Sequence, residues 1–129
     1  MEEKQIKKKL SKEQYHVMRE KGTEKPFSGK WLDNKDKGKY MCAVCGNVLF
    51  ESKNKFDSGS GWPSFDKPAK KDNIETAPDH KLILKRTEIL CNKCKSHLGH
   101  VFDDGPTKTK KRYCINSLAL DFEKEDATT

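Results

Sequence analysis

Four of the five cysteines form two Cys-x-x-Cys pairs, which is the spacing most often used to bind a metal ion. Cys42 and Cys45 make the first pair, and Cys91 and Cys94 make the second. This spacing lets both thiolates of a tight turn face one ion, and two pairs complete a tetrahedral site of four sulfurs that suits zinc. Gly46 follows the first pair, where the chain must reverse. We therefore expect one structural Zn²⁺ and no organic cofactor.

A redox role is the alternative for the two pairs, because Cys-x-x-Cys also occurs in thioredoxin-type oxidoreductases. In those proteins the pair opens a helix that stabilises the thiolate, whereas each pair here lies between two predicted strands. Residues 46–90 separate the two pairs, so an ion bound by both would connect distant segments of the chain.

Cys114 is the fifth cysteine, and its neighbours indicate a nucleophile. It lies in the segment Arg112-Tyr113-Cys114-Ile115-Asn116. The period of two of a β-strand places Arg112, Cys114 and Asn116 on one face, and the two residues between them on the other. A cation beside the thiol favours the reactive thiolate. The alternative is a free cysteine that packs as a small apolar residue.

Two histidines that follow the second cysteine pair could act as acids or bases in one site. A regular strand would place His97 and His100 on opposite faces. Gly99 lies between them and can host a bulge that turns both imidazoles to the same side. The alternatives are a surface position for the histidines, or His97 replacing Cys94 as a metal ligand.

Trp62 follows a turn rich in Gly and Ser, in the segment Gly61-Trp62-Pro63-Ser64-Phe65. A large aromatic residue at the tip of a loop is more typical of a binding site than of a core. The alternative is a Trp that caps a small β core.

The elements that must position these residues are short. Ser11 and Gln14 form a capping box, which predicts a helix that ends near Gly22. The remaining apolar residues fall in short runs separated by turn-rich stretches, a pattern that predicts strands. The expected strands span residues 39–42, 47–52, 82–90, 97–102, 112–116 and 118–122. We expect a mainly β fold with antiparallel sheets and one or two short helices.

The length of 129 residues suits a single domain over residues 1–129, with a core at about 10–122 and polar tails. Leu, Ile, Val and Phe together make up less than a fifth of the chain, so the core is thin. A bound metal would supply part of the missing stability.

The formal net charge of +7 comes almost entirely from lysines, because the chain has only three arginines. Specific reading of phosphates and base edges favours arginine, so the lysines indicate a solvated surface. The first residues lack the apolar segment of a signal peptide, and no apolar run reaches the roughly 18 residues of a membrane helix. We expect a cytoplasmic location, and neither a nucleic acid nor a membrane as partner.

These motifs together resemble those of the methionine-R-sulfoxide reductases, the MsrB family. The resemblance covers about residues 10–122. It rests on four groups of residues: Gly22-Thr23-Glu24 with Pro26-Phe27, Lys55 to Phe65, His97 to Phe102, and Arg112 to Ser117.

The resemblance implies a fold of two antiparallel sheets and a set of roles for the residues above. Cys114 would attack the sulfur of methionine-R-sulfoxide, and His97 and His100 would bind and protonate its oxygen. Trp62 would hold the S-methyl group. Asn116 and Arg112 would complete the substrate-binding residues. The products would be methionine and a sulfenic acid on Cys114.

One departure from the family bears on how the enzyme is reset. Many members carry a resolving cysteine just before the Trp motif, whereas residues 58–61 are Ser-Gly-Ser-Gly. The resemblance therefore implies that an external thiol, such as thioredoxin, reduces the sulfenic acid. We expect a monomer that acts on methionine-R-sulfoxide in oxidised proteins. The alternatives are a zinc-dependent module that binds nucleic acid or protein, and a general thiol oxidoreductase.

Overall fold

The computed structural model describes residues 2–79 and 86–125 of the chain. Two helices open it, α1 (Glu3–Lys9) and α2 (Lys12–Arg19). The capping box of α2 is confirmed, because Ser11 Oγ accepts the N–H of Gln14 while Gln14 Oε1 accepts the N–H of Ser11. Neither helix is long and apolar enough to cross a membrane.

The ends of this helical region differ from the sequence-based expectation. Helix α2 stops at Arg19, because Lys21 adopts a left-handed φ of 59° and the N–H of Gly22 turns back to His16 O. Helix α1 lies in a stretch expected to be a polar tail. Its Ile6 is nevertheless buried, so packing against the core begins before residue 10.

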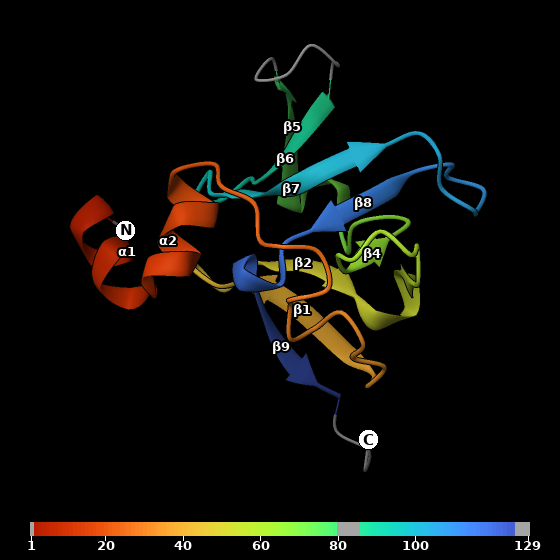
Figure 1. The fold of residues 1–129 in the computed structure, drawn as a ribbon, viewed down its shortest axis with the longest axis horizontal. Coiled ribbons are helices and arrows are strands. Elements are labelled where there is room, and N and C mark those ends of the chain that lie inside the picture. The colour runs from red at the N-terminus through yellow and green to blue at the C-terminus, as the bar shows by residue number, and fades with distance from the viewer. Residues whose placement is uncertain (1, 80–85, 126–129) are drawn as a thin grey trace.

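The strands within the described residues form two antiparallel sheets, which confirms the predicted fold class (Figure 1). The smaller sheet has the order β2-β1-β9 and the larger has the order β3-β4-β8-β7-β6-β5. The strands of the smaller sheet are β1 (Gly38–Cys42), β2 (Val48–Glu51) and β9 (Leu120–Lys124). Those of the larger sheet are β3 (Lys55–Phe56), β4 (Ser64–Phe65), β5 (Ile74–Asp79), β6 (Arg86–Cys91), β7 (His97–Phe102) and β8 (Arg112–Ile115). Short 3₁₀ helices span Ser52–Asn54, Lys71–Asn73 and Ser117–Ala119.

Most of the predicted strands are present with shifted ends. The strand expected at 118–122 begins only at Leu120, because Ser117–Ala119 form a 3₁₀ turn. Part of the strand expected at 82–90 falls outside the described residues. Three further strands were not expected: β3 and β4 have two residues each, which is too short for an alternating pattern, and β5 contains Pro78.

A cluster of buried aromatic rings joins the two sheets. Phe50 of the smaller sheet stacks on Phe65 of the larger, with ring centroids 4.5 Å apart. Tyr40 meets Phe65 edge-on at 5.2 Å, and all three side chains are fully buried. Such pairs stabilise the fold beyond the area that they bury.

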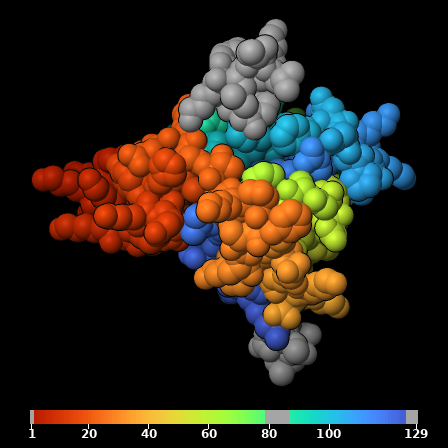
Figure 2. Space-filling model, in the orientation of Figure 1, coloured from red at the N-terminus to blue at the C-terminus, as the bar shows by residue number. Residues whose placement is uncertain are grey.

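The segment between α2 and β1, at about residues 20–37, crosses the molecule in front of both sheets (Figure 1). Figure 2 shows its orange atoms directly beside the yellow-green atoms of the region around β4. Two distant parts of the sequence therefore meet on one face of the protein.

Candidate active site and four-cysteine cluster

Cys114 lies in β8, between strands β4 and β7 of the larger sheet. In the register of the sheet it faces Ser64 of β4 on one side and His100 of β7 on the other. The predicted alternation of β8 is confirmed. Tyr113 packs against Phe50 on the core side, with ring centroids 5.8 Å apart, whereas Cys114 opens into a cavity on the other face.

The cavity has a volume of about 310 Å³ and contains five of the six predicted active-site residues. Its lining residues are Thr23, Ser60, Trp62, Gly99, His100, Phe102, Arg112, Cys114 and Asn116. Cys114 is only 9% exposed, so a reactant reaches its sulfur through this cavity. His97 is the predicted residue that the lining does not include.

The sulfur of Cys114 accepts a hydrogen bond from Arg112, whose Nη1 lies 2.8 Å from Sγ. Asp104 holds the same guanidinium through Nε at 2.8 Å and Nη2 at 3.0 Å. This ion pair raises the pKa of Arg112, and the ring of Phe102 lies 4.4 Å from the guanidinium carbon. Arg112 is therefore fixed with one N–H directed at sulfur, an arrangement that suits a thiolate.

Three serines surround the other side of the sulfur. Ser60 Oγ and Ser64 Oγ each lie 3.6 Å from Cys114 Sγ, and Ser58 Oγ lies 2.7 Å from both hydroxyls. Among the described residues, the polar side-chain groups within hydrogen-bonding distance of this sulfur are thus a guanidinium and two hydroxyls. None of them is a thiol.

The distortion predicted in β7 is confirmed. Ile89 and Leu90 are neighbours in β6 but pair with Gly99 and His97, so Leu98 is an extra residue in β7. The bulge brings the two imidazoles of this strand together, with ring centroids 5.4 Å apart.

Gly99 allows β7 to lie close to β8 beside the site. A Cβ at this position would lie 2.0 Å from the carbonyl oxygen of Cys114. No side chain fits that space without moving one of the strands.

His97 lies behind the cavity, packed against His100. It is 2% exposed, and its Nδ1 lies 2.6 Å from Oε2 of the buried Glu88. Burial lowers the pKa of His97, while the carboxylate of Glu88 acts in the opposite direction. Nε2 of His97 is buried and has no hydrogen-bond partner among the described residues. His97 is thus placed to support His100, and His100 is the histidine that reaches the cavity.

The main chain of Glu24 holds two residues of the cavity in place. Its carbonyl accepts the indole N–H of Trp62 at 3.0 Å, and its N–H donates to Asn116 Oδ1 at 3.0 Å. Asn116 Nδ2 in turn donates to Leu98 O at 2.9 Å. The buried Glu24 carboxylate accepts the N–H of Leu118, and burial raises its pKa. Asn116 therefore connects the segment between α2 and β1 (about residues 20–37) with β7 and with the end of β8.

Sequence reasoning missed Asp104, Glu88, Glu24 and the serines around the sulfur. Asp104 lies eight residues before Arg112, in the β7–β8 connection, and this spacing alone does not predict an ion pair. Glu88 is the one acidic residue of β6 and has no clear sequence signal of burial. The role of the Glu24 main chain has no signal in the sequence.

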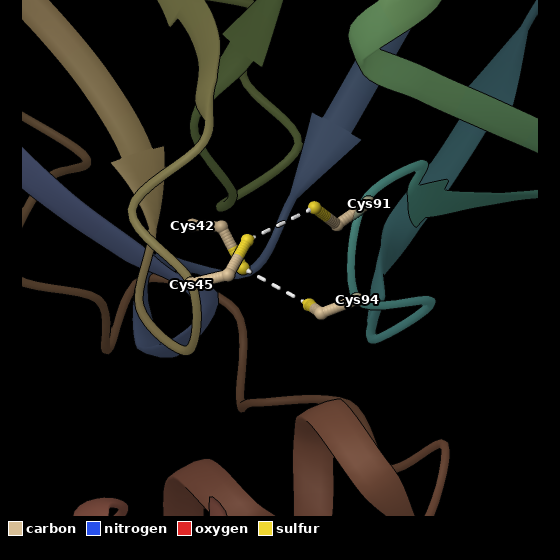
Figure 3. A group of neighbouring side chains, drawn as sticks. All are labelled: Cys42, Cys45, Cys91 and Cys94. Atoms are coloured by element: carbon tan, nitrogen blue, oxygen red, sulfur yellow. Dashed lines mark hydrogen bonds between the residues drawn. The ribbon is translucent and has the colours of Figure 1, made fainter. Parts of the chain in front are cut away.

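The four remaining cysteines converge from the two sheets, as Figure 3 shows. Cys42 and Cys94 have sulfurs 3.6 Å apart, those of Cys45 and Cys91 are 3.5 Å apart, and all four lie within 4.8 Å of one another. A tetrahedral zinc site with Zn–S distances near 2.3 Å requires sulfurs about 3.8 Å apart. The arrangement therefore fits one zinc ion.

The two cysteine turns have matching geometry. Gly46, with a φ of 79°, donates its N–H to Cys42 O, and Lys95, with a φ of 61°, donates its N–H to Cys91 O. Burial raises the pKa of Cys45 to about 11. Four crowded thiols of this kind ionise together only when a cation balances their charge.

Side chains from the N-terminal helices and from Asn47, just before β2, brace these turns. Lys9 Nζ donates to Val44 O at 2.6 Å, and Arg19 Nη1 donates to Cys94 O at 3.2 Å. Asn47 Nδ2 lies 3.7 Å from Cys91 Sγ. The helix visible below the two turns in Figure 3 thus supports the cluster from outside.

Cys114 is a single thiol in a polar and aromatic cavity, and the other four cysteines form a separate cluster that could bind a metal. This combination is typical of a β-sheet thiol oxidoreductase with a structural metal site. Comparison with known families makes this class specific. The model of the SelR domain matches residues 10–124. The chain belongs to the MsrB family of peptide methionine sulfoxide reductases.

The chain is similar to several curated members over most of its length. It is 55% identical over 119 residues to "Peptide methionine sulfoxide reductase MsrB" of Methanosarcina mazei, covering 92% of this chain and 85% of that protein. It is 56% identical over 119 residues to the protein of the same name from Leptospira interrogans, covering 92% and 91%. It is also 49% identical to "Methionine-R-sulfoxide reductase B3, mitochondrial" of Mus musculus, over 96% of this chain and 49% of the mouse protein.

Proposed function

We propose that this chain reduces methionine-R-sulfoxide in oxidised proteins to methionine, with Cys114 as the nucleophile. The single observation that carries the proposal is the position of Cys114. It is the one cysteine outside the four-cysteine cluster, and it lies in the cavity with the Arg112 guanidinium 2.8 Å from its sulfur. The names of the similar proteins supply the substrate class.

The reaction requires a thiolate and an acid, because a sulfoxide sulfur is electrophilic while its oxygen is a poor leaving group. The Cys114 thiolate, the sulfoxide and one proton give methionine and a sulfenic acid on Cys114. The S–O bond of the substrate breaks and a new S–O bond forms on the enzyme. The substrate sulfur gains two electrons, and the Cys114 sulfur loses the same two.

The cavity residues divide these tasks. Arg112, held by Asp104, donates its N–H to the thiolate, and His100, opposite Cys114 in the sheet, donates the proton to the sulfoxide oxygen. His97 supports His100 from behind. Trp62 contacts the S-methyl group with its ring. Selectivity for the R epimer would follow, because only one epimer can place its oxygen at His100, its methyl group at the indole and its sulfur at Cys114 at the same time.

Recycling depends on an outside thiol, which we propose to be thioredoxin or a similar reductant. The chain has five cysteines, of which four belong to the cluster, and residues 58–61 before the Trp motif include no cysteine. A disulfide between Cys114 and a cluster cysteine would break the cluster.

The proposed metal is one Zn²⁺ held by Cys42, Cys45, Cys91 and Cys94, and it supplies a structural cross-link. We also propose a single domain over residues 1–129 that acts as a monomer. A reducing compartment such as the cytoplasm suits the proposal, since the four ligand thiols must stay reduced.

The test is an assay with the separated R and S epimers of N-acetylmethionine sulfoxide and a small dithiol. We expect N-acetylmethionine from the R epimer alone. Cys114→Ser should abolish turnover while its zinc content and Tm stay near those of the parent, because the thiol is not a ligand. Turnover of both epimers, or substantial activity in Cys114→Ser, would contradict the proposal.

A further inference from the structure

Phe27 is the large apolar side chain that the described residues expose, with 70% of its surface accessible. A single exposed apolar residue usually needs no explanation. The backbone of Phe27, however, has a φ of 65°, in the left-handed region that a bulky side chain rarely adopts. Both features cost folding stability, and their coincidence points to a role in function.

The structure holds the ring of Phe27 in a defined place. Its backbone N–H donates to Gly61 O at 2.7 Å. Pro26 and Phe27 then cover the face of Gly61 that lacks a side chain, since a Cβ there would lie 2.6 Å from Pro26 Cβ and 3.0 Å from the Phe27 ring. The left-handed backbone and this close approach together fix the direction of the aromatic side chain.

The ring of Phe27 lies at the rim of the active-site cavity. Gly61 lies directly between Ser60 and Trp62, and both of these residues line the cavity. The chain segment that carries Phe27 is also joined to the indole of Trp62 through the carbonyl of Glu24. The two segments lie side by side on the face shown in Figure 2.

We propose that Phe27 binds the polypeptide on one side of the methionine sulfoxide, through an apolar side chain one or two residues from it. This inference rests on the proposed function. Successive residues of an extended chain are about 3.3 to 3.6 Å apart, so a neighbour of the bound residue reaches from the cavity to its rim.

The chemistry of the substrate favours an apolar contact. Methionine is an apolar residue that packs among other apolar residues, and oxidation makes it polar and exposes its surroundings. A flat aromatic ring accepts many apolar side chains without demanding one shape, as an enzyme that acts on many proteins requires. The occupant is thus an apolar, extended segment of an oxidised protein.

The test compares two substrates with a small dithiol as reductant, so that docking of a protein reductant plays no part. One substrate is N-acetylmethionine-R-sulfoxide amide, and the other is a peptide with methionine-R-sulfoxide between leucines. The variant is Phe27→Asn, because asparagine tolerates a left-handed backbone. We expect kcat/KM for the peptide to fall roughly tenfold through a higher KM, with the small amide within twofold of the parent.

Three controls make the result specific. Lys25→Ala removes an exposed neighbour and should leave kcat/KM for both substrates unchanged. Phe27→Tyr keeps an aromatic ring and should have the same KM for the peptide as the parent. The Tm of Phe27→Asn should equal or exceed that of the parent, because the substitution relieves strain.

Several results would overturn the inference. An equal loss on both substrates would assign Phe27 to the geometry of the cavity, and no loss on either would remove it from binding. A loss that occurs only when thioredoxin replaces the dithiol would assign the ring to the reductant. Inactivity of the parent on the small amide would instead count against the proposed function itself.

Discussion

At the scale of residues, the site depends on how charged groups are distributed around one sulfur. Arg112 approaches Cys114 along the same strand, two residues away, and Asp104 prevents the guanidinium from swinging into solvent. On the opposite wall, the bulge in β7 brings His97 behind His100, where Glu88 fixes it. The thiol of Cys114, the guanidinium of Arg112 and the imidazole of His100 thus come from adjacent strands of a single sheet.

Alternation along β8 made the faces of Arg112, Cys114 and Asn116 predictable from the sequence. The partners of these residues were not predictable. Strand pairing and the path of the segment between α2 and β1 place Asp104, Glu88 and Glu24 around the site. A spacing along the chain has no information about such contacts. For the same reason the sequence could not separate His100, which reaches the cavity, from His97, which does not.

The buried His97 predicts a dependence of stability on pH. Burial lowers its pKa in the folded state below the usual 6.5. As the pH falls, the unfolded chain therefore binds a proton at His97 before the folded chain does. The unfolding free energy should therefore fall as the pH decreases below about 6.5. Urea unfolding at pH 7.5 and 5.5 measures this change, and His97→Gln should show a smaller decrease than the parent. Equal decreases in both proteins would show that His97 does not cause it.

At the scale of elements, the close approach of β7 and β8 sets the positions of the reacting groups. Gly99 permits that approach, and the pairing of His100 with Cys114 follows from it. Apart from β5, which contains Pro78, the longer strands were predictable because they alternate or carry β-branched and aromatic residues. The two-residue strands β3 and β4 were not, since the pairing of β3 with β4 and of β4 with β8, rather than local preference, keeps them extended.

Gly99→Ala tests this arrangement. The added Cβ would lie 2.0 Å from Cys114 O, so the strands must separate, and we expect a loss of about 2 kcal/mol or more in unfolding free energy. Gly59→Ala is the matched control. Gly59 has a φ of 73° and no atom within 4 Å of the added Cβ, so its cost should be only about 1 kcal/mol. Urea unfolding measures both values, and equal costs would contradict the claim of a steric requirement at Gly99.

At the scale of the whole molecule, the four-cysteine cluster connects the two sheets. Cys42 and Cys45 belong to the β1–β2 hairpin of the smaller sheet, and Cys91 and Cys94 belong to the β6–β7 hairpin of the larger. The sequence predicted the four cysteines that form this cluster. It could not predict that helices α1 and α2 brace the turns through Lys9 and Arg19.

Replacing one ligand should therefore affect stability far more than replacing the cavity thiol. We expect Cys42→Ser to lose its zinc and more than about 3 kcal/mol of unfolding free energy. Cys114→Ser, which makes the same chemical change outside the cluster, is the matched control and should retain both. Metal analysis and thermal unfolding provide the measurements. Well-folded parent protein without metal would contradict the role of the cluster.

The most direct test of the account is a single turnover without any reductant. Reduced enzyme is mixed with excess N-acetylmethionine-R-sulfoxide, and the product, the modified cysteine and the bound zinc are quantified together. In the proposed mechanism Cys114 is the reacting thiol and the other four cysteines bind zinc. We therefore predict one N-acetylmethionine per chain, a trappable sulfenic acid on Cys114 and full retention of zinc. Release of zinc together with a disulfide between Cys114 and a cluster cysteine, or no product at all, would contradict the account.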